Sequence, residues 1–196
     1  MNHSLIHSLY KIGAVKFGNF TLKSGKTSKI YLDLRQIVSY PEILTAVGEA
    51  LWEKIKDAKF DLLCGVPYTA LPMATAISLQ HKIPMIMRRK EKKDYGTKQQ
   101  IEGAFKSGQN CLIIEDVITT GGSIIETSEE LIAAGLKITD VALLIDREQG
   151  GKENLQQNQF RVHSVFTLSE ILNVLLTSSI LTAQEQTIVN ELISEA

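Results

Sequence analysis

Cysteine is scarce in this sequence, which holds two among its 196 residues, and neither belongs to a C-x-x-C pair. Cys64 and Cys111 each lie in an apolar run, so reduced packing residues are favoured over a disulfide. Metal-ligand spacing is also missing, and no structural zinc site is predicted from the four histidines, which are His3, His7, His81 and His163.

Long apolar runs are absent as well, since none approaches the roughly 20 residues of a membrane span. The N-terminus, MNHSLIHSLYK, lacks a basic segment followed by an apolar core, which a secretory signal would show. Hydrophobic residues make up 44% of the chain and charged residues 22%, within the ordinary globular range. We therefore expect one soluble, cytoplasmic domain with a substantial core.

Net charge is nearly absent, at −1, but it is unevenly distributed. Residues 88–98, RRKEKKDYGTK, hold six basic and two acidic residues, so this segment carries +4 and the rest of the chain −5. A protein that follows a nucleic-acid backbone usually spreads basic residues over a face, often with aromatic residues between them. The local cluster favours a small polyanion, and no nucleic-acid or membrane partner is predicted.

Repeats and low-complexity linkers are missing too, and strand-like runs alternate with helix-like segments. Strands are predicted over 61–66, 83–87, 111–116 and 141–146. Helical spacing after Ser39, with Glu42 as a capping-box partner, and the stretch 67–80 predict the first two helices between them. This alternation indicates an α/β fold with a parallel sheet and crossover helices.

Further helix starts are predicted by capping boxes, in which Ser or Thr is followed three residues later by Glu. Ser123 and Glu126 predict a helix that Gly135 ends. Thr167 with Glu170, and Thr182 with Glu185, predict two amphipathic C-terminal helices.

The stretch CLIIEDVITTGGS, residues 111–123, carries the chemistry. Ligands of open parallel sheets bind at the carboxyl ends of strands, where this loop is expected. Glu115 and Asp116 can accept hydrogen bonds from vicinal hydroxyls, while the amides of residues 119–123 suit a phosphate. Ribose 5-phosphate satisfies both halves, although an ordinary strand-to-helix turn with acids at the cap explains the residues equally well. No P-loop or G-x-G-x-x-G fingerprint occurs, which disfavours ATP hydrolysis and nicotinamide chemistry.

IIEDVITTGGS resembles the ribose-phosphate loop of the type I phosphoribosyltransferases. Within them the chain is similar to the orotate phosphoribosyltransferases from about residue 12 to 170, and in particular to the phosphoribosyltransferase half of uridine monophosphate synthase. Four further segments carry this resemblance, namely FTLKSGKTSKIYLDLR at 20–35, CGVPYTALPMA at 64–74, RRKEKKDYGTK at 88–98 and LLIDREQGG at 143–151.

The resemblance implies a type I phosphoribosyltransferase fold over residues 1–196, with about five central strands flanked by helices. A small hood is implied from about 40 N-terminal residues and part of the C-terminal segment. It also implies a homodimer that transfers 5-phosphoribosyl from phosphoribosyl diphosphate to N1 of orotate, in pyrimidine biosynthesis. Magnesium is the implied cofactor, held mainly by diphosphate and ribose hydroxyls, with no direct protein ligand assigned.

Catalytic roles carry over to Lys93, Glu115 and Asp116. Contacts to phosphoribosyl diphosphate carry over to Lys23, Tyr68, Thr69, Arg89, Lys90, Lys93, Tyr95, Glu115, Asp116, Val117, Ile118, Thr119, Thr120, Gly121, Gly122 and Ser123. Contacts to orotate carry over to Tyr31, Leu32, Thr119 and Arg147.

Each single residue also has a plainer interpretation. Lys23 can lie at the surface with its stem on apolar groups, and Tyr31 with Leu32 can be core packing. Arg147 can form a surface ion pair with Asp146 or Glu148.

Residues 89–102 resemble the family's lid, which closes over the diphosphate and reaches the partner subunit's site. Its plainer interpretation is a solvated loop, because the segment is long and polar. Lys93 is expected to stabilise the departing diphosphate. Many bacterial relatives carry histidine where this chain has Tyr95, and a neutral phenol supplies no such charge.

Two rival functions stay open. One is a purine phosphoribosyltransferase, against which Lys23, the Tyr31–Leu32 pair and Arg147 count. The other is a non-catalytic regulator that senses phosphoribosyl diphosphate and binds RNA or DNA, against which the acidic pair and the charge distribution count.

Overall fold

The computed structural model describes residues 2–21, 25, 27–90 and 100–194. The chain forms two compact units. The smaller unit combines Met1–Ile43 with Thr167–Ala196, and the larger unit is Leu44–Phe166.

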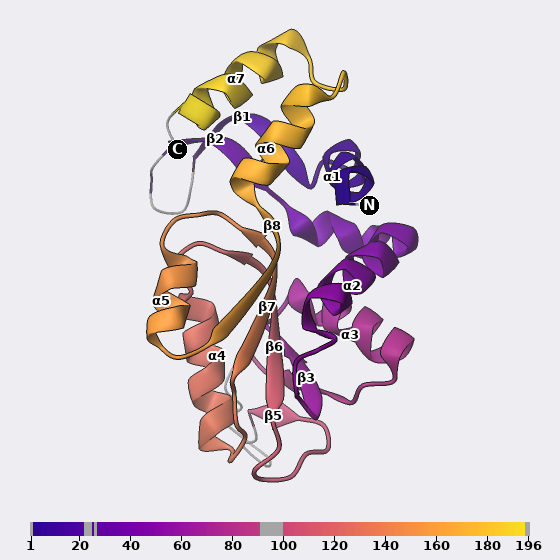
Figure 1. Cartoon of the computed structure of the whole chain (residues 1–196), viewed down its shortest axis with the longest axis vertical. Coiled ribbons are helices and arrows are strands. Elements are labelled where there is room, and N and C mark those ends of the chain that lie inside the picture. The colour runs from indigo at the N-terminus through magenta and orange to yellow at the C-terminus, as the bar shows by residue number, and fades with distance from the viewer. Residues whose placement is uncertain (1, 22–24, 26, 91–99, 195–196) are drawn as a thin grey trace. The chain divides into compact units, whose positions relative to one another are not determined.

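A central sheet forms the middle of the larger unit (Figure 1). It has six strands in the order β5-β4-β3-β6-β7-β8. Its strands are β3 (Leu62–Gly65), β4 (Met85–Arg88), β5 (Ile101–Glu102), β6 (Cys111–Ile118), β7 (Asp140–Asp146) and β8 (Arg161–Thr167). The pairs β4–β3, β3–β6 and β6–β7 are parallel, whereas β5 runs antiparallel to β4. The predicted α/β class with a mostly parallel sheet is confirmed, and each predicted strand has its counterpart.

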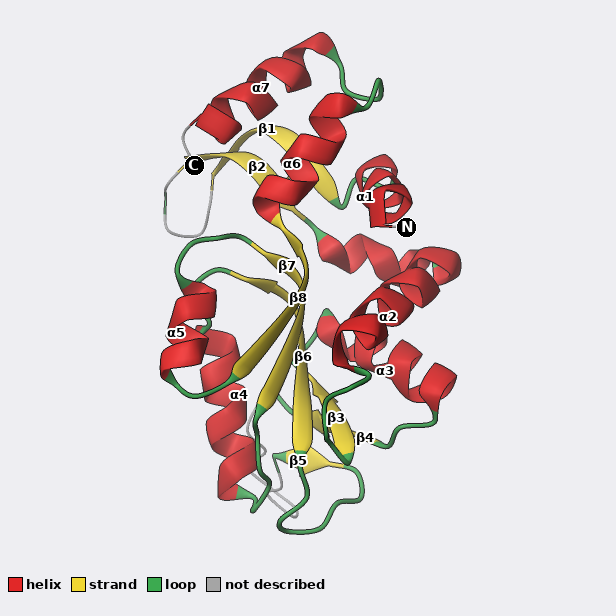
Figure 2. Cartoon of the chain, viewed as in Figure 1, coloured by secondary structure: helices red, strands yellow, loops and turns green. Residues whose placement is uncertain are grey.

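Helices cover both faces of this sheet, as Figure 2 shows. On one face lie α2 (Pro41–Ile55) and α3 (Ala70–His81), and on the other lie α4 (Gly122–Ala133) and α5 (Gly151–Gln157). All seven residues of β7 are buried, as expected for a strand with covered faces. The core between the layers includes Cys64, Ile113 and Leu143. Both cysteines are buried free thiols, as predicted.

The smaller unit contains an antiparallel pair, β1 (Val15–Thr21) with β2 (Thr27–Leu32), and the helix α1 (Asn2–Lys11). A 3₁₀ helix, η1, spans Leu34–Ser39, and two further helices are α6 (Leu168–Thr177) and α7 (Ala183–Ser194). Two of the predicted capping boxes are confirmed here. Thr167 Oγ1 accepts from the Glu170 amide at 3.2 Å, and Thr182 Oγ1 accepts from the Glu185 amide at 3.3 Å. In each box the glutamate accepts from the threonine amide in return.

Two boundaries differ from prediction. Ser39 ends the 3₁₀ helix and Tyr40 separates it from α2, so the predicted cap at Ser39 is wrong. Proline instead opens α2 at Pro41, where a missing N–H costs nothing. The predicted loop 89–102 is wrong at its end, because Ile101 and Glu102 form β5 and Ile101 is buried.

Candidate active site

Four candidate segments follow four neighbouring parallel strands of the larger unit. Residues 66–69 follow β3, residues 89–90 follow β4, residues 119–121 follow β6, and Arg147 follows β7. Because the carboxyl ends of parallel strands meet at one edge of a sheet, the topology brings these segments together. The Arg147 amide donates to the Ile118 carbonyl oxygen at 3.2 Å, which joins Arg147 directly to the last residue of β6.

The loop after β6 presents backbone amides without protein partners. Gly121 is the N-cap of α4 and has φ 85°, a conformation that glycine adopts at little cost. Among the described residues, none of the amides from Thr119 to Ser123 donates a hydrogen bond to the protein. Free amides at a helix N-terminus, where the helix dipole is positive, suit an anion such as phosphate.

The predicted capping box at this helix is wrong. Ser123 lies in the first turn of α4 rather than before it, and its hydroxyl donates to Glu115 Oε2 at 2.9 Å. Glu126, the expected partner, pairs with Arg88 instead. Ser123 and Glu126 therefore bond to residues that are distant in the sequence, and the local capping box does not form.

The acidic pair combines a buried and a more open carboxylate. Glu115 is 5% exposed, and its Oε1 accepts from the Asp116 amide at 3.0 Å. The Asp116 carboxylate is partly exposed and accepts from the Val117 amide at 2.8 Å. Burial, together with the adjacent Asp116, raises the pKa of Glu115 well above its usual value, whereas the Ser123 hydrogen bond opposes this shift. The pair is built to meet hydroxyl donors or positive charge.

Arg147 has an unused donor. Its side chain is half-buried, and its Nε atom is buried with no hydrogen-bond partner among the described residues. Burial lowers the pKa of this guanidinium. A buried donor without a partner costs free energy, and a carbonyl or carboxylate oxygen of a ligand would satisfy it.

The segments after β3 and β4 also meet. Lys90 Nζ lies 5.4 Å from the centroid of the Tyr68 ring, and the Tyr68 side chain is 58% exposed. Thr69 immediately precedes α3. Arg89 Nε donates to Glu102 Oε1 at 2.6 Å, so this predicted ligand residue is paired within the protein.

Tyr31 and Leu32 lie on β2 of the smaller unit, and both are partly buried. The Tyr31 hydroxyl accepts from Arg35 Nη2 at 2.9 Å, and the Tyr31 ring lies 5.4 Å from that of Phe20. Their predicted role toward orotate stays a prediction. Lys23, Lys93 and Tyr95 lie outside the described residues.

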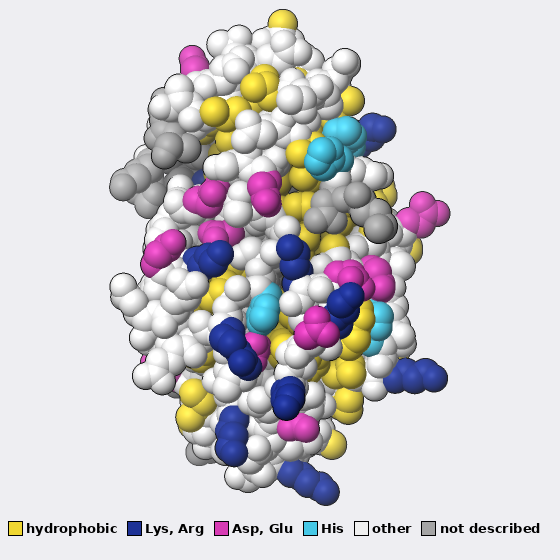
Figure 3. Space-filling model, in the orientation of Figure 1, with side chains coloured by type: hydrophobic (Ala, Val, Ile, Leu, Met, Phe, Trp, Pro, Cys, Tyr) yellow, Lys and Arg dark blue, Asp and Glu magenta, His cyan; other side chains and the backbone are white. Residues whose placement is uncertain are grey.

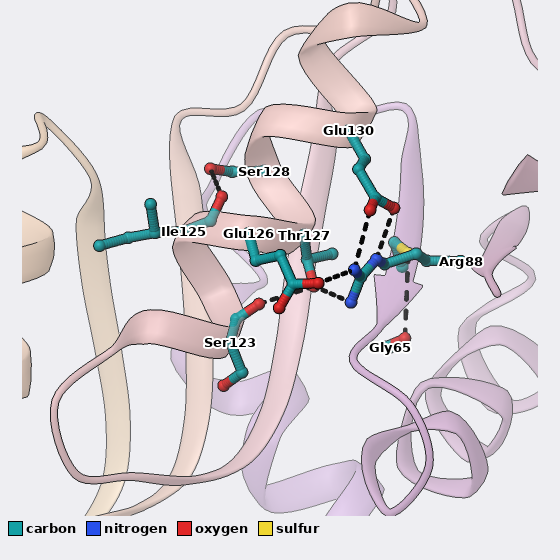
Figure 4. Close-up of polar contacts among 9 residues, drawn as sticks. Gly65, Arg88, Ser123, Ile125, Glu126, Thr127, Ser128 and Glu130 are labelled. Atoms are coloured by element: carbon teal, nitrogen blue, oxygen red, sulfur yellow. Dashed lines mark hydrogen bonds and ion pairs between the residues drawn. The ribbon is translucent and has the colours of Figure 1, made fainter. Parts of the chain in front are cut away.

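Sequence reasoning missed an ion-pair cluster around the buried Arg88, shown in Figure 4, which includes Ser123 at the end of the phosphate loop, residues 119–123. Arg88, 6% exposed, reaches from β4 to three residues of α4, pairing with Glu126 and Glu130 and lying 3.5 Å from Thr127 Oγ1. Thr127 Oγ1 donates to the Ser123 carbonyl oxygen at 2.8 Å. No local signal announces these contacts, because about 40 residues of chain separate the partners.

The phosphoribosyl transferase domain family matches residues 33–169. Uridine 5′-monophosphate synthase of Bos taurus is 56% identical over 88% of the chain, although the chain spans only 36% of that relative's length. Orotate phosphoribosyltransferase of Chlamydia caviae is 40% identical over 98% of the chain and 94% of its own length.

The chain belongs to the phosphoribosyl transferase family, among its orotate phosphoribosyltransferases. The solved structure of orotate phosphoribosyltransferase from Aeropyrum pernix shares its fold, with a TM-score of 0.79, 34% identity, and coverage of 87% of this chain and 97% of that one. The predicted resemblance is therefore confirmed. The acids Glu115 and Asp116 lie on β6 and residues 119–121 follow its carboxyl end, whereas their predicted roles stay predictions.

Neither a metal cluster nor a membrane span is found in the described part of this phosphoribosyltransferase. Its His, Cys, Asp and Glu side chains form no group of three or more that could enclose a metal ion. Its described helices are all too short or too polar to cross a membrane. On the face in Figure 3, Lys and Arg are interspersed with Asp and Glu rather than gathered in one continuous patch.

Proposed function

We propose that this chain is an orotate phosphoribosyltransferase that forms orotidine 5′-monophosphate and diphosphate from orotate and phosphoribosyl diphosphate. The carboxylates of Glu115 and Asp116, with the five amides of residues 119–123 that have no partner in the described part of the protein, carry this proposal. One ligand with vicinal hydroxyls and a phosphate satisfies both groups.

The two halves of the ligand meet different chemistry. The amides from Thr119 to Ser123 hold the 5-phosphate, and the carboxylates of Glu115 and Asp116 accept from the ribose 2′- and 3′-hydroxyls. As C1′ loses diphosphate, it gains oxocarbenium character, which nearby negative charge stabilises. The ribose hydroxyls also complete the hydrogen bonding of the buried Glu115 carboxylate, which lowers the free-energy cost of its burial.

We assign cationic side chains to binding both the diphosphate leaving group and the orotate base. The diphosphate is bound by Lys90, Arg89 and the amides of Tyr68 and Thr69. Lys93 assists its departure. Arg147 donates to orotate oxygens from its buried Nε, which has no partner among the described residues, and this contact favours the carboxylate of orotate over uracil. Tyr31, Leu32 and Thr119 complete the proposed orotate contacts, while Lys23 and Tyr95 add contacts to phosphoribosyl diphosphate.

The two carboxylates of the site fit a magnesium ion that is bound mainly by the substrate. Mg²⁺ usually keeps few protein ligands and binds phosphate oxygens, which matches a site with two carboxylates and no closed cage among the described residues. Asp116, the more exposed acid, would hold it through ribose hydroxyls or water. When bound, the ion neutralises charge on the diphosphate.

The proposed enzyme is a homodimer in which the segment between β4 and β5, residues 89–100, serves the partner's site as a lid, an arrangement supported by family resemblance. A non-catalytic regulator would not require the donors of Arg147 or the acidic pair.

Acceptor preference tests the function against the purine alternative. We expect orotidine 5′-monophosphate as the product when orotate, uracil, hypoxanthine and adenine compete for phosphoribosyl diphosphate with magnesium, measured by chromatography. Orotate should be favoured over uracil by at least about 100-fold, because unpaired polar groups strongly penalise the wrong ligand. Preferential nucleotide formation from hypoxanthine or adenine would refute the assignment.

A further inference from the structure

Helix α5 forms a floor beneath the phosphate loop. Gly151, Asn154 and Leu155 lie three and four residues apart, on one face of this helix. A Cβ atom at Gly151 would lie 2.6 Å from the Thr119 carbonyl oxygen, and one at Gly121 would lie 3.2 Å from Leu155 Cδ2. Gly151 of α5 is therefore in close contact with the backbone of Thr119, and Leu155 of α5 with Gly121.

Asn154 makes the one side-chain hydrogen bond from α5 to this loop among the described residues. Its Nδ2 donates to the Thr120 carbonyl oxygen at 2.8 Å. The orientation of the amide is dictated by chemistry, because Oδ1 in the same place would face another acceptor.

This hydrogen bond sets the direction of the next amide. In a trans peptide the carbonyl of one residue and the N–H of the next point in opposite directions. With the Thr120 carbonyl held toward α5, the Gly121 N–H points away from α5, and it donates to no acceptor among the residues that the structure describes. Asn154 thus aims one of the five amides that receive the phosphate.

Glycine makes such an external restraint necessary. Rotation of the Thr120–Gly121 peptide changes φ of Gly121, and glycine populates both signs of φ at similar cost. Gly121 allows the observed φ of 85° but does not enforce it. A rotated peptide would present a carbonyl oxygen to the phosphate in place of an N–H.

We propose that Asn154 is a positioning residue for the phosphate loop, fixing the Thr120–Gly121 peptide so that its N–H faces the 5-phosphate; the inference rests on the proposed function. Asn154 touches neither the phosphate nor the reacting atoms. It acts through the Thr120 carbonyl oxygen, while its Oδ1 accepts from Asn158 Nδ2 at 3.3 Å at the end of α5.

The test compares Asn154→Ala with wild type, because alanine removes the donor, adds no charge and favours the helix. We expect the Kd for ribose 5-phosphate, measured by calorimetry, and the KM for phosphoribosyl diphosphate to rise about 5- to 10-fold, in keeping with one lost hydrogen bond to a carbonyl and a misaimed amide. The KM for orotate should stay within about twofold and Tm within about 2 °C, since only the phosphate loop is affected.

Asn154→Asp provides a second arm. Its carboxylate would repel the Thr120 carbonyl oxygen at pH 8, and protonation would restore a donor, so the ratio of variant to wild-type Kd should shrink as pH falls to about 4, close to the usual Asp pKa. Gln157→Glu, which adds the same charge on the exposed last turn of α5, controls for electrostatic repulsion and should change Kd less than about twofold.

An unchanged Kd for ribose 5-phosphate in Asn154→Ala overturns the inference. So does a parallel rise of both KM values with a large fall in Tm, which is the signature of a merely structural residue. If wild type fails to consume orotate, the proposed function fails, while the ribose 5-phosphate comparison still decides the role of Asn154.

Discussion

At the scale of single residues, Glu115 places a buried carboxyl group in the candidate site at a cost in folding stability. The carboxylate is buried, lies beside Asp116, and receives donors from Ser123 and the Asp116 amide. Burial and the neighbouring charge raise the pKa, so the folded protein binds a proton here more tightly than the unfolded chain does. Stability from this group is full below its usual pKa of 4.5 and is lost as pH rises through the raised folded value.

Replacing this carboxyl with a neutral amide should therefore stabilise the free protein at alkaline pH. Glu115→Gln keeps an acceptor for the Asp116 amide and a donor for the Ser123 hydroxyl. We expect Tm at pH 8 to rise by roughly 2–4 °C and activity to fall, with a smaller Tm difference at pH 5. Calorimetry on both proteins at the two pH values measures this, and a lower Tm at pH 8 would show that the charge is well solvated.

At the scale of elements, Arg88 ties β4 to α4. The guanidinium is buried against Glu130, Glu126 and Thr127. Side-chain hydrogen bonds to glutamates raise the pKa of Arg88 despite its burial, so the cation is permanent. This connection joins the strand that leads into Arg89 and Lys90 to the helix that begins at the phosphate loop.

Removing the cation should cost far more than removing its exposed partner. Arg88→Met leaves Glu130 partly buried without its cation and is expected to lower the free energy of unfolding by about 2–3 kcal/mol. Glu126 is 64% exposed in its side chain, so Glu126→Gln should cost less than about 1 kcal/mol. Urea unfolding of the two variants provides the comparison, and equal losses would mean that the buried pairing contributes little.

Elements also show what sequence can predict. The box at Thr167 and Glu170 was correctly predicted because both partners lie within one turn and no distant group competes. The box at Ser123 and Glu126 satisfied the same local rule and failed, since Glu115 and Arg88 bind those side chains from other strands. Local motifs thus gave β3, β4, β6 and β7, the helices α2, α3, α4, α6 and α7, and the loop after β6, whereas β5, β8, α1 and α5 were not predicted. Arg88 and Asn154 depend on contacts made only by the folded chain.

At the scale of the whole molecule, the larger unit gathers its candidate residues by topology. Four parallel neighbours deliver Tyr68, Lys90, the phosphate loop and Arg147 to one edge of the sheet. These residues come from separate parts of the sequence. Several motifs in the order of the family therefore indicated the family more strongly than any one motif alone. The partner subunit is proposed to supply Lys93.

Subunit mixing tests that shared site. Lys93→Ala and Asp116→Asn should each be inactive as homodimers. If the lid serves the partner's site, an equal mixture that re-equilibrates yields about half heterodimers, each with one intact site, and about a quarter of wild-type activity. Activity that stays at the level of the separate variants after exchange, confirmed by native mass spectrometry, would place the lid in its own subunit's site.

Orotate turnover tests the central claim most directly. The initial rate of orotate absorbance loss should depend on phosphoribosyl diphosphate and on magnesium, and should fall at least about 100-fold in Asp116→Asn, because the carboxylate acts on charge that develops in the transition state. Circular dichroism should show that this variant folds like wild type. Folded wild-type dimer that leaves orotate unchanged with all components present, or an Asp116→Asn variant that retains full activity, would contradict the account.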